Sequence, residues 1–125
     1  MKVVLDAGAF VAVERGDRQL GAMLRVLQQR RVPLRTSAAV VAQVWRDGRK
    51  QARIAQLLAG VSVGALAPDN DRRTGELLAR ARTADVIDAH LALEVDDDDR
   101  VLTSDPDDLA HLLAARRVDA TIVAV

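Results

Sequence analysis

Short apolar runs and longer amphipathic stretches alternate along the whole chain. Five runs have the length and composition of strands, and they cover about residues 1–5, 33–36, 61–66, 100–103 and 121–125. Seven stretches with apolar residues at helical spacing predict helices at about residues 7–15, 17–30, 37–45, 51–58, 68–82, 85–95 and 106–115. Strands joined by helices form right-handed crossovers, so this order predicts an α/β fold with one parallel sheet of five strands between helices.

The length of the chain predicts a single domain over residues 1–125, because 125 residues that are 50% hydrophobic can build one core. No apolar run approaches the ~20 residues that cross a bilayer, and the first residues do not form a signal peptide. We therefore expect a cytoplasmic protein without a membrane partner. The absence of cysteine excludes a thiolate zinc site and a cysteine nucleophile, and His90 and His111 have no partner at metal-ligand spacing.

The formal net charge is zero, but the charges are unevenly distributed along the chain. Nine basic residues and a single acid lie between Arg18 and Arg53, whereas ten acids and a single base lie between Asp85 and Asp108. Such blocks are usually solvated helix faces. They also allow a dipolar molecule, in which one end holds cations and the other attracts a polyanion.

Asp6 is an unusual residue with which to end a buried strand, because only the small residues Ala7, Gly8 and Ala9 follow it. In open parallel sheets the functional site lies at the carboxyl ends of the strands. Asp105 closely follows the strand at 100–103, so it converges with Asp6 if those two strands are neighbours. A third carboxylate, Asp88, lies in a helix that is apolar on nearly every side.

Local structural roles remain open for several of these acids. Asp85 as an N-cap and Asp88 three residues later imitate a capping box. Asp105 is suited to cap the helix that begins at Pro106, and Asp108 to interact with the dipole of that helix. These roles do not account for Asp6, which has no helix to cap as obviously. Clustered carboxylates raise one another's pKa unless a cation lies among them, and oxygen ligands suit Mg²⁺ or Mn²⁺.

The chain resembles a PIN domain, and specifically the VapC-type ribonuclease toxins of bacterial toxin–antitoxin pairs. Four stretches carry the resemblance over essentially the whole length, and they read VVLDAGAF, TSAAVVAQVW, DVIDAHLAL and VLTSDPDDL. The resemblance implies a three-layer α/β/α PIN-like fold and a Mg²⁺- or Mn²⁺-dependent endoribonuclease. It also implies a homodimer and a cognate antitoxin whose C-terminal segment lies across the active site.

The resemblance assigns roles to individual residues. Asp6, Asp88 and Asp105 fall on the acidic positions of the family, as catalytic residues and metal ligands. Thr103 falls on its supporting hydroxyl, and Asp108 on the acid that often follows. In this interpretation a divalent ion binds the scissile phosphate and lowers the pKa of a bound water, which Asp105 orients.

One position departs from the family pattern. Gln43 stands where the family most often has glutamate, and its amide oxygen brings no charge and cannot act as a base. We expect Gln43 and the helix cap Asp85 to support the site, and Glu14 to be a surface residue. Gln43 also favours an alternative function, a PIN-like RNA- or protein-binding regulator that has lost turnover. A phosphoacceptor receiver domain fits poorly, because it needs a lysine late in the chain and none follows Lys50.

A candidate RNA-binding stripe follows the second motif. Its members are Arg46, Arg49, Lys50 and Arg53. They form one stripe at helical spacing if Gly48 distorts the helix only slightly. A solvated face explains the same pattern equally well. Trp45, beside the stripe, offers a surface for base stacking, but in a chain so poor in aromatic residues a place in the core is the favoured interpretation.

Overall fold

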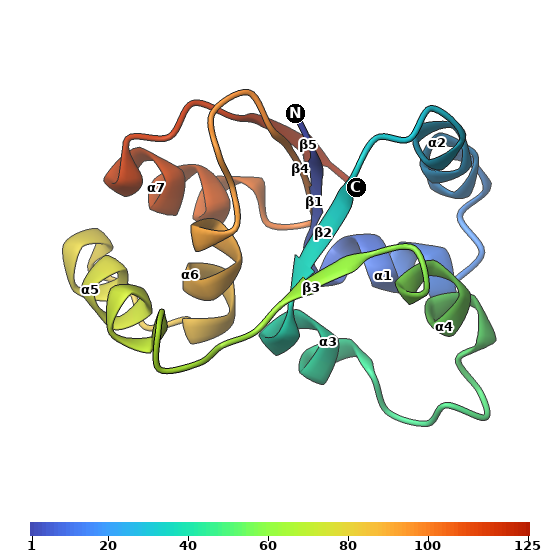
Figure 1. Cartoon of the computed structure of the whole chain (residues 1–125), viewed down its shortest axis with the longest axis horizontal. Helices are drawn as coiled ribbons and strands as arrows, with labels where there is room; N and C mark the ends of the chain where they lie inside the picture. Colours follow the sequence, from blue (N-terminus) through green and yellow to red (C-terminus); the bar gives the residue numbers. More distant parts are fainter.

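A five-stranded parallel sheet crosses the middle of the protein, as the alternation of strands and helices predicts (Figure 1). The computed structural model describes all 125 residues. The strands are β1 (Val3–Leu5), β2 (Leu34–Ser37), β3 (Ser62–Gly64), β4 (Arg100–Thr103) and β5 (Thr121–Ala124). Their order is β3-β2-β1-β4-β5, and every neighbouring pair is parallel. The predicted fold class is therefore confirmed, and β1 and β4 are neighbours.

Seven helices cover the two faces of the sheet. They are α1 (Ala7–Glu14), α2 (Arg18–Gln29), α3 (Ala38–Val44), α4 (Ala52–Leu58), α5 (Asp71–Ala81), α6 (Val86–Leu93) and α7 (Pro106–Arg116). Helices α5, α6 and α7 contact one another on one side, and α2 and α4 both pack against α1 on the other (Figure 1). Helix α3 follows the carboxyl end of β2 and contacts both α1 and α6. None of the helices has the length and apolar character needed to span a bilayer.

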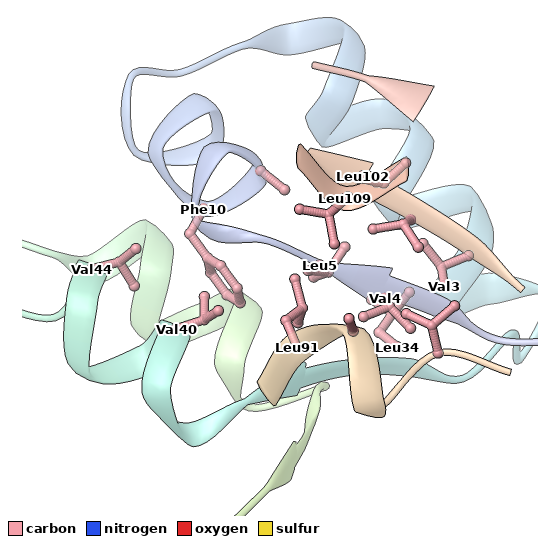
Figure 2. Packing of buried hydrophobic residues seen from close by; sticks show 14 of the residues in the cluster. Val3, Val4, Leu5, Phe10, Leu34, Val40, Val44, Leu91, Leu102 and Leu109 are labelled. Atoms are coloured by element: carbon pink, nitrogen blue, oxygen red, sulfur yellow. The ribbon is translucent and has the colours of Figure 1, made fainter. Parts of the chain in front are cut away.

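The core forms around β1, the central strand of the sheet. Val3, Val4 and Leu5 are all buried, as expected for a parallel strand that is covered on both faces. Phe10 of α1 is fully buried and points toward Val40 of α3 (Figure 2). This packing fixes α1 and α3 at the carboxyl end of the sheet, which is the end where the candidate site lies.

The chain between α3 and α4 is not helical, so the predicted basic stripe is not one helix face. The side chain of Gln51, which is buried, accounts for this break. Its Oε1 accepts from the backbone N–H groups of Arg46 at 2.7 Å and Asp47 at 3.0 Å, and its Nε2 donates to the Val44 carbonyl at 2.8 Å. These bonds satisfy backbone groups that a continuous helix would otherwise pair.

Trp45 does not belong to the core, contrary to the favoured interpretation. Its side chain lies on the surface, 37% exposed, and its backbone is extended where the helix ends. Gly48 permits the close approach of the indole ring, because a Cβ at Gly48 would lie 2.8 Å from Trp45 Cζ2. Trp45 thus packs against its own loop.

Candidate functional site

Asp6 lies at the junction of β1 and α1, and its carboxylate is held from two sides. Its Oδ2 accepts a hydrogen bond of 2.6 Å from Thr103 Oγ1, and its Oδ1 accepts one of 2.7 Å from the backbone N–H of Ala7. The sequence gives Asp6 no obvious helix to cap, yet the structure shows that it is the N-cap of α1. Burial raises the pKa of Asp6, the two hydrogen bonds oppose this rise, and the charges of Asp105 and Asp85 add to it.

Thr103 connects the two strands that carry the site. It is fully buried at the end of β4, next to β1 in the sheet. Its Oγ1 donates to Asp6 and accepts from the backbone N–H of Asp105 at 2.9 Å. One hydroxyl therefore fixes both the orientation of the Asp6 carboxylate and the turn that presents Asp105.

Gly8 allows α1 to approach that turn. A Cβ at Gly8 would lie 2.5 Å from Ser104 Oγ and 2.8 Å from the Ser104 backbone nitrogen, which is closer than real Cβ atoms come. In the sequence, Gly8 stands out only as a residue too small to shield Asp6. Its role in positioning depends on the contact between α1 and the β4–α7 turn, which no local pattern reveals.

Asp88 is half-buried on the first turn of α6. Asp85 Oδ1 caps the helix by accepting from the Asp88 backbone N–H at 3.0 Å, but the Asp88 side chain does not return a bond to Asp85. Burial is the largest cause that raises the pKa of Asp88 to about 7. The other causes are the charges of nearby acids, in order Asp6, Asp85, Asp105 and Asp108.

Asp105 and Asp108 are exposed at the start of α7. Asp105 occupies the N-cap position, yet its side chain makes no capping hydrogen bond. The capping role that was open for Asp105 is therefore not realised. Asp108 lies in the first turn, where a negative charge interacts favourably with the helix dipole.

No basic side chain neutralises these acids. The protein has four ion pairs, Lys2 with Asp96 and with Asp99, Arg35 with Glu94, and Arg49 with Asp47, and none includes an acid of the cluster. The cluster of Asp6, Asp85, Asp88, Asp105 and Asp108 is hereafter called the acidic cluster. Its oxygens are the donors that Mg²⁺ and Mn²⁺ prefer.

A ready-made ligand cage is nevertheless absent. No three histidine, aspartate or glutamate side chains lie close enough together to hold a metal ion. Mg²⁺ keeps several waters in proteins and is usually bound through one or two carboxylates, so a magnesium site does not require three protein ligands. The chemistry of the oxygen donors therefore suits a divalent cation, although the side chains do not converge into a preformed site.

Gln43 lies beside the acidic cluster. It is exposed on α3 and lines a cavity of about 610 Å³ together with Asp105, Gly8 and Ser104. Of the acidic cluster, Asp105 lines this cavity with Gln43, whereas Asp6 and Asp88 do not. Arg15, which no sequence pattern singles out, lines the same cavity.

The four residues of the predicted RNA-binding stripe lie elsewhere. None of Arg46, Arg49, Lys50 and Arg53 lines the cavity beside the acidic cluster. Arg46 Nη1 donates to the carbonyls of Ala42 at 2.9 Å and Trp45 at 2.8 Å, and Arg49 pairs with Asp47. Arg53 donates to the Glu14 carbonyl at 3.1 Å. It also lines a second cavity, which includes Arg18 and Arg25.

His90 has a structural part in the site, whereas its sequence position predicts none. It is fully buried, with Nδ1 2.5 Å from Ser37 Oγ and Nε2 3.1 Å from the Ala65 carbonyl oxygen. These contacts tie α6 to the end of β2 and to the chain after β3. Since Asp88 is two residues away on α6, His90 also fixes the position of Asp88.

Comparison with known proteins reveals similarity at the level of the fold. No family model matches the chain. A search of curated proteins also finds no match. Among solved structures, the chain matches one in the crystal structure of VapBC2 from Rickettsia felis bound to a DNA fragment from their promoter. The TM-score is 0.68 at 13% identity, over 100% of this chain and 99% of the other.

The two chains share a fold. The match covers both almost completely, so it includes the sheet, both helical layers and the edge where the acidic cluster lies. It agrees with the PIN-like fold that the motifs imply. At 13% identity the likeness concerns the fold, and the chemistry must be argued from the residues.

Proposed function

We propose that the protein is a Mg²⁺- or Mn²⁺-dependent endoribonuclease and acts as the toxin of a toxin–antitoxin pair. The observation that carries the proposal is the acidic cluster, which gathers five carboxylates at the carboxyl edge of the sheet without a single basic partner. The carboxylates of such a cluster repel one another in their ionised forms unless a cation is bound among them. The fold shared with a chain of the VapBC2 complex supports the proposal.

Each residue has a part in this proposal. Asp6, Asp88 and Asp105 would hold the ion. When bound, the ion lowers the pKa of a water molecule and offsets negative charge on the phosphate oxygens. Thr103 Oγ1 keeps Asp6 Oδ2 in place. Asp105, exposed and without a capping bond, orients the attacking water.

We also propose a protein partner. The matched structure is described as VapBC2, a two-component complex, and a cognate antitoxin is the corresponding partner for this chain. Met23 and Val26 on α2 are more than 40% exposed, so they provide apolar surface for an antitoxin or for a second copy in a homodimer. RNA is the proposed substrate.

A regulator without turnover is the second candidate function, and Gln43 favours it. A neutral amide beside the acidic cluster removes one ligand charge, and no three acids form a cage. Such a protein would bind RNA or a partner protein through the same fold. Turnover distinguishes the two candidates.

Cleavage of a mixed RNA pool tests the proposed enzyme. We expect products in Mg²⁺ or Mn²⁺, none in EDTA, and none from Asp6→Asn or Asp88→Asn, because each variant removes a ligand charge. Asp107→Asn is the matched control, since Asp107 is exposed in the first turn of α7 and is not among the main causes that raise the pKa of Asp88. This control should cleave like the parent.

Two results would contradict these assignments. Cleavage in EDTA at the rate seen in Mg²⁺ would exclude the metal-dependent reaction. Parent-like cleavage by Asp6→Asn or Asp88→Asn under limiting Mg²⁺ would show that the altered residue is not a ligand. Circular dichroism should show both variants folded, and unfolding of Asp88→Asn alone would assign Asp88 a structural role.

A further inference from the structure

One face of α1 forms the wall of the cavity beside the acidic cluster. Ala7, Gly8, Val11 and Ala12 line it, at positions that lie together on one side of a helix. Gln43 and Asp105 also line this cavity of about 610 Å³. The wall has only small and medium side chains, so a bound molecule can approach the α1 backbone closely.

Charged residues lie toward both ends of the cavity. Asp105 and the N-terminus of α1 mark one end, and Arg15, directly after α1, marks the other. Gly8 and Arg15 are seven residues apart, about 10 Å along the helix axis. Arg15 is the only basic residue of the lining, is exposed, and takes part in none of the ion pairs.

Asp17, the remaining acid of the lining, forms no ion pair with Arg15. Asp17 Oδ1 accepts from the Leu20 backbone N–H at 3.0 Å as the N-cap of α2. Asp17 therefore has a structural role of its own. The guanidinium of Arg15 remains available for an anion at the end of the cavity away from Asp105.

We propose that this cavity binds one nucleotide of single-stranded RNA next to the cleaved bond, and that Arg15 binds the phosphate of that nucleotide. This inference rests on the proposed ribonuclease function. Guanidinium groups bind phosphate through two parallel hydrogen bonds. The cavity has a volume suited to a small ligand, and the Gln43 amide offers both donors and acceptors to a base edge or a 2′-hydroxyl.

A single strand fits this arrangement better than a duplex. Double-stranded RNA is recognised across a broad surface by many contacts to phosphates and 2′-hydroxyls. Here Arg15 is the one basic residue in a concave site. A splayed single nucleotide, with its base against the α1 wall, uses the concave shape and the single cation together.

RNA binding by variants of Arg15 tests the inference. The protein carries Asp6→Asn to prevent cleavage, and a fluorescein-labelled single-stranded oligoribonucleotide is titrated in Mg²⁺ at several salt concentrations. Arg15→Ala should weaken binding about tenfold, as expected for one charged hydrogen-bonded contact. The slope of log K against log salt should become shallower by about 0.7, as expected for one lost phosphate contact on a single strand.

Two further variants separate charge from contact geometry. Arg72→Ala removes an equal charge from the exposed face of α5, which does not pack on α1, and should leave affinity and slope unchanged. Arg15→Lys should keep the slope while losing part of the affinity, because lysine keeps the charge but not the planar fork.

The outcomes distinguish this inference from the proposed function. If the parent cleaves RNA while Arg15→Ala behaves like Arg72→Ala in both affinity and slope, the nucleotide site is wrong and the ribonuclease stands. If the parent neither binds nor cleaves RNA, both proposals fail together.

Discussion

Asp88 is the residue whose ionisation connects the acidic cluster to protein stability. Its pKa in the folded protein is about 7, against an ordinary value of 3.8, so the folded state binds a proton that the unfolded state has lost between these pH values. The resulting stabilisation is fully present below pH 3.8 and disappears as the pH rises through 7. The acidic cluster therefore makes the metal-free protein less stable at alkaline pH.

Replacing Asp88 by asparagine should remove much of this pH dependence. In EDTA, the free energy of unfolding of Asp88→Asn should change less between about pH 5 and pH 8 than that of the parent. It should also exceed the parent value at the alkaline end of this range, because an uncharged side chain relieves the repulsion. Urea denaturation across this pH range measures both effects.

Asp107→Asn is again the matched control, and its stability should follow the pH dependence of the parent. The pKa of Asp6 is raised as well, so a weaker dependence with the same sign should persist in Asp88→Asn. Parallel curves for Asp88→Asn and the parent would mean that Asp88 does not carry the proton.

At the same scale, the residues that sequence reasoning missed act through tertiary contacts. Gln51 bonds to backbone groups of the preceding loop and donates to Glu14 Oε1 at 3.2 Å, 37 positions away. Arg15 resembles the other exposed arginines until α1 places it on a particular cavity. The carboxylates were predictable because strand ends and helix starts are visible as local patterns.

Among the elements, the contact of α1 with the β4–α7 turn determines how closely Asp6 and Asp105 approach. Gly8 lies close to this turn, and the atoms nearest to an added Cβ include the backbone nitrogen of Ser104, which cannot rotate away. A side chain at this position must displace α1 or the turn. Gly75, in contrast, lies within α5 in open space, and a Cβ added there would meet no atom within 4 Å.

Two glycine substitutions should consequently have opposite effects. Gly8→Ala should lower the free energy of unfolding by about 1–3 kcal/mol, as overpacking usually does. Gly75→Ala should raise it by about 0.5–1 kcal/mol, because alanine favours an exposed helix. Urea denaturation of both proteins measures the pair.

Metal titration of the same two proteins separates stability from the site. Gly8→Ala should bind Mn²⁺ more weakly than the parent, since the displacement moves Asp6 relative to Asp105. Gly75→Ala should bind Mn²⁺ like the parent. A rise in stability for Gly8→Ala would show that α1 does not need this close approach.

The elements themselves were largely predictable from sequence. The β1 run is continuous and apolar because both faces of a central parallel strand are buried. Asp17 and Ser37 mark the starts of α2 and α3 through side-chain caps. The break between the helices at 37–45 and 51–58 was predicted from Gly48, but the sequence did not show that the buried Gln51 side chain holds the backbone of this loop. The periodic spacing of residues does not show that a buried side chain bonds to the backbone of the preceding loop.

Across the whole molecule, the acidic cluster and the arginines of the second cavity lie in different places. The acidic cluster lies at the carboxyl edge of the sheet, where β1 and β4 end. Arg18, Arg25 and Arg53 line the second cavity, formed with α2 and α4 on the face of the sheet away from α5, α6 and α7 (Figure 1). Such a field orients a polyanion before contact, so the basic cavity and the acidic cluster are complementary parts of the proposed RNA-binding molecule.

A divalent ion in the acidic cluster would connect elements from both helical layers. Asp6 lies at the start of α1, Asp88 on α6 and Asp105 at the start of α7. Because an ion that binds only the folded state stabilises it by mass action, metal affinity should be measurable as an increase in global stability. At one hundred times the Kd this stabilisation is about 2.7 kcal/mol.

The thermal stability of Gln43→Glu in Mn²⁺ should therefore report on the whole site. Without metal the variant should melt below the parent, because a further negative charge joins the acidic cluster. Addition of Mn²⁺ should raise the melting temperature of Gln43→Glu more than that of the parent, since a carboxylate replaces a neutral amide. The melting temperature of Asp6→Asn should rise least. Mn²⁺ suits the test because it binds a given site no more weakly than Mg²⁺ and tolerates less ideal geometry.

Different results would have different consequences. Unchanged melting of Gln43→Glu, with and without metal, would place the residue 43 side chain away from the acidic cluster and shift the second motif by part of a helical turn. A Mn²⁺ response in Gln43→Glu but none in the parent would make the natural protein a regulator without turnover. In that case the amide at Gln43 would be the change that removed metal binding, and RNA or protein binding would be the remaining function of the fold.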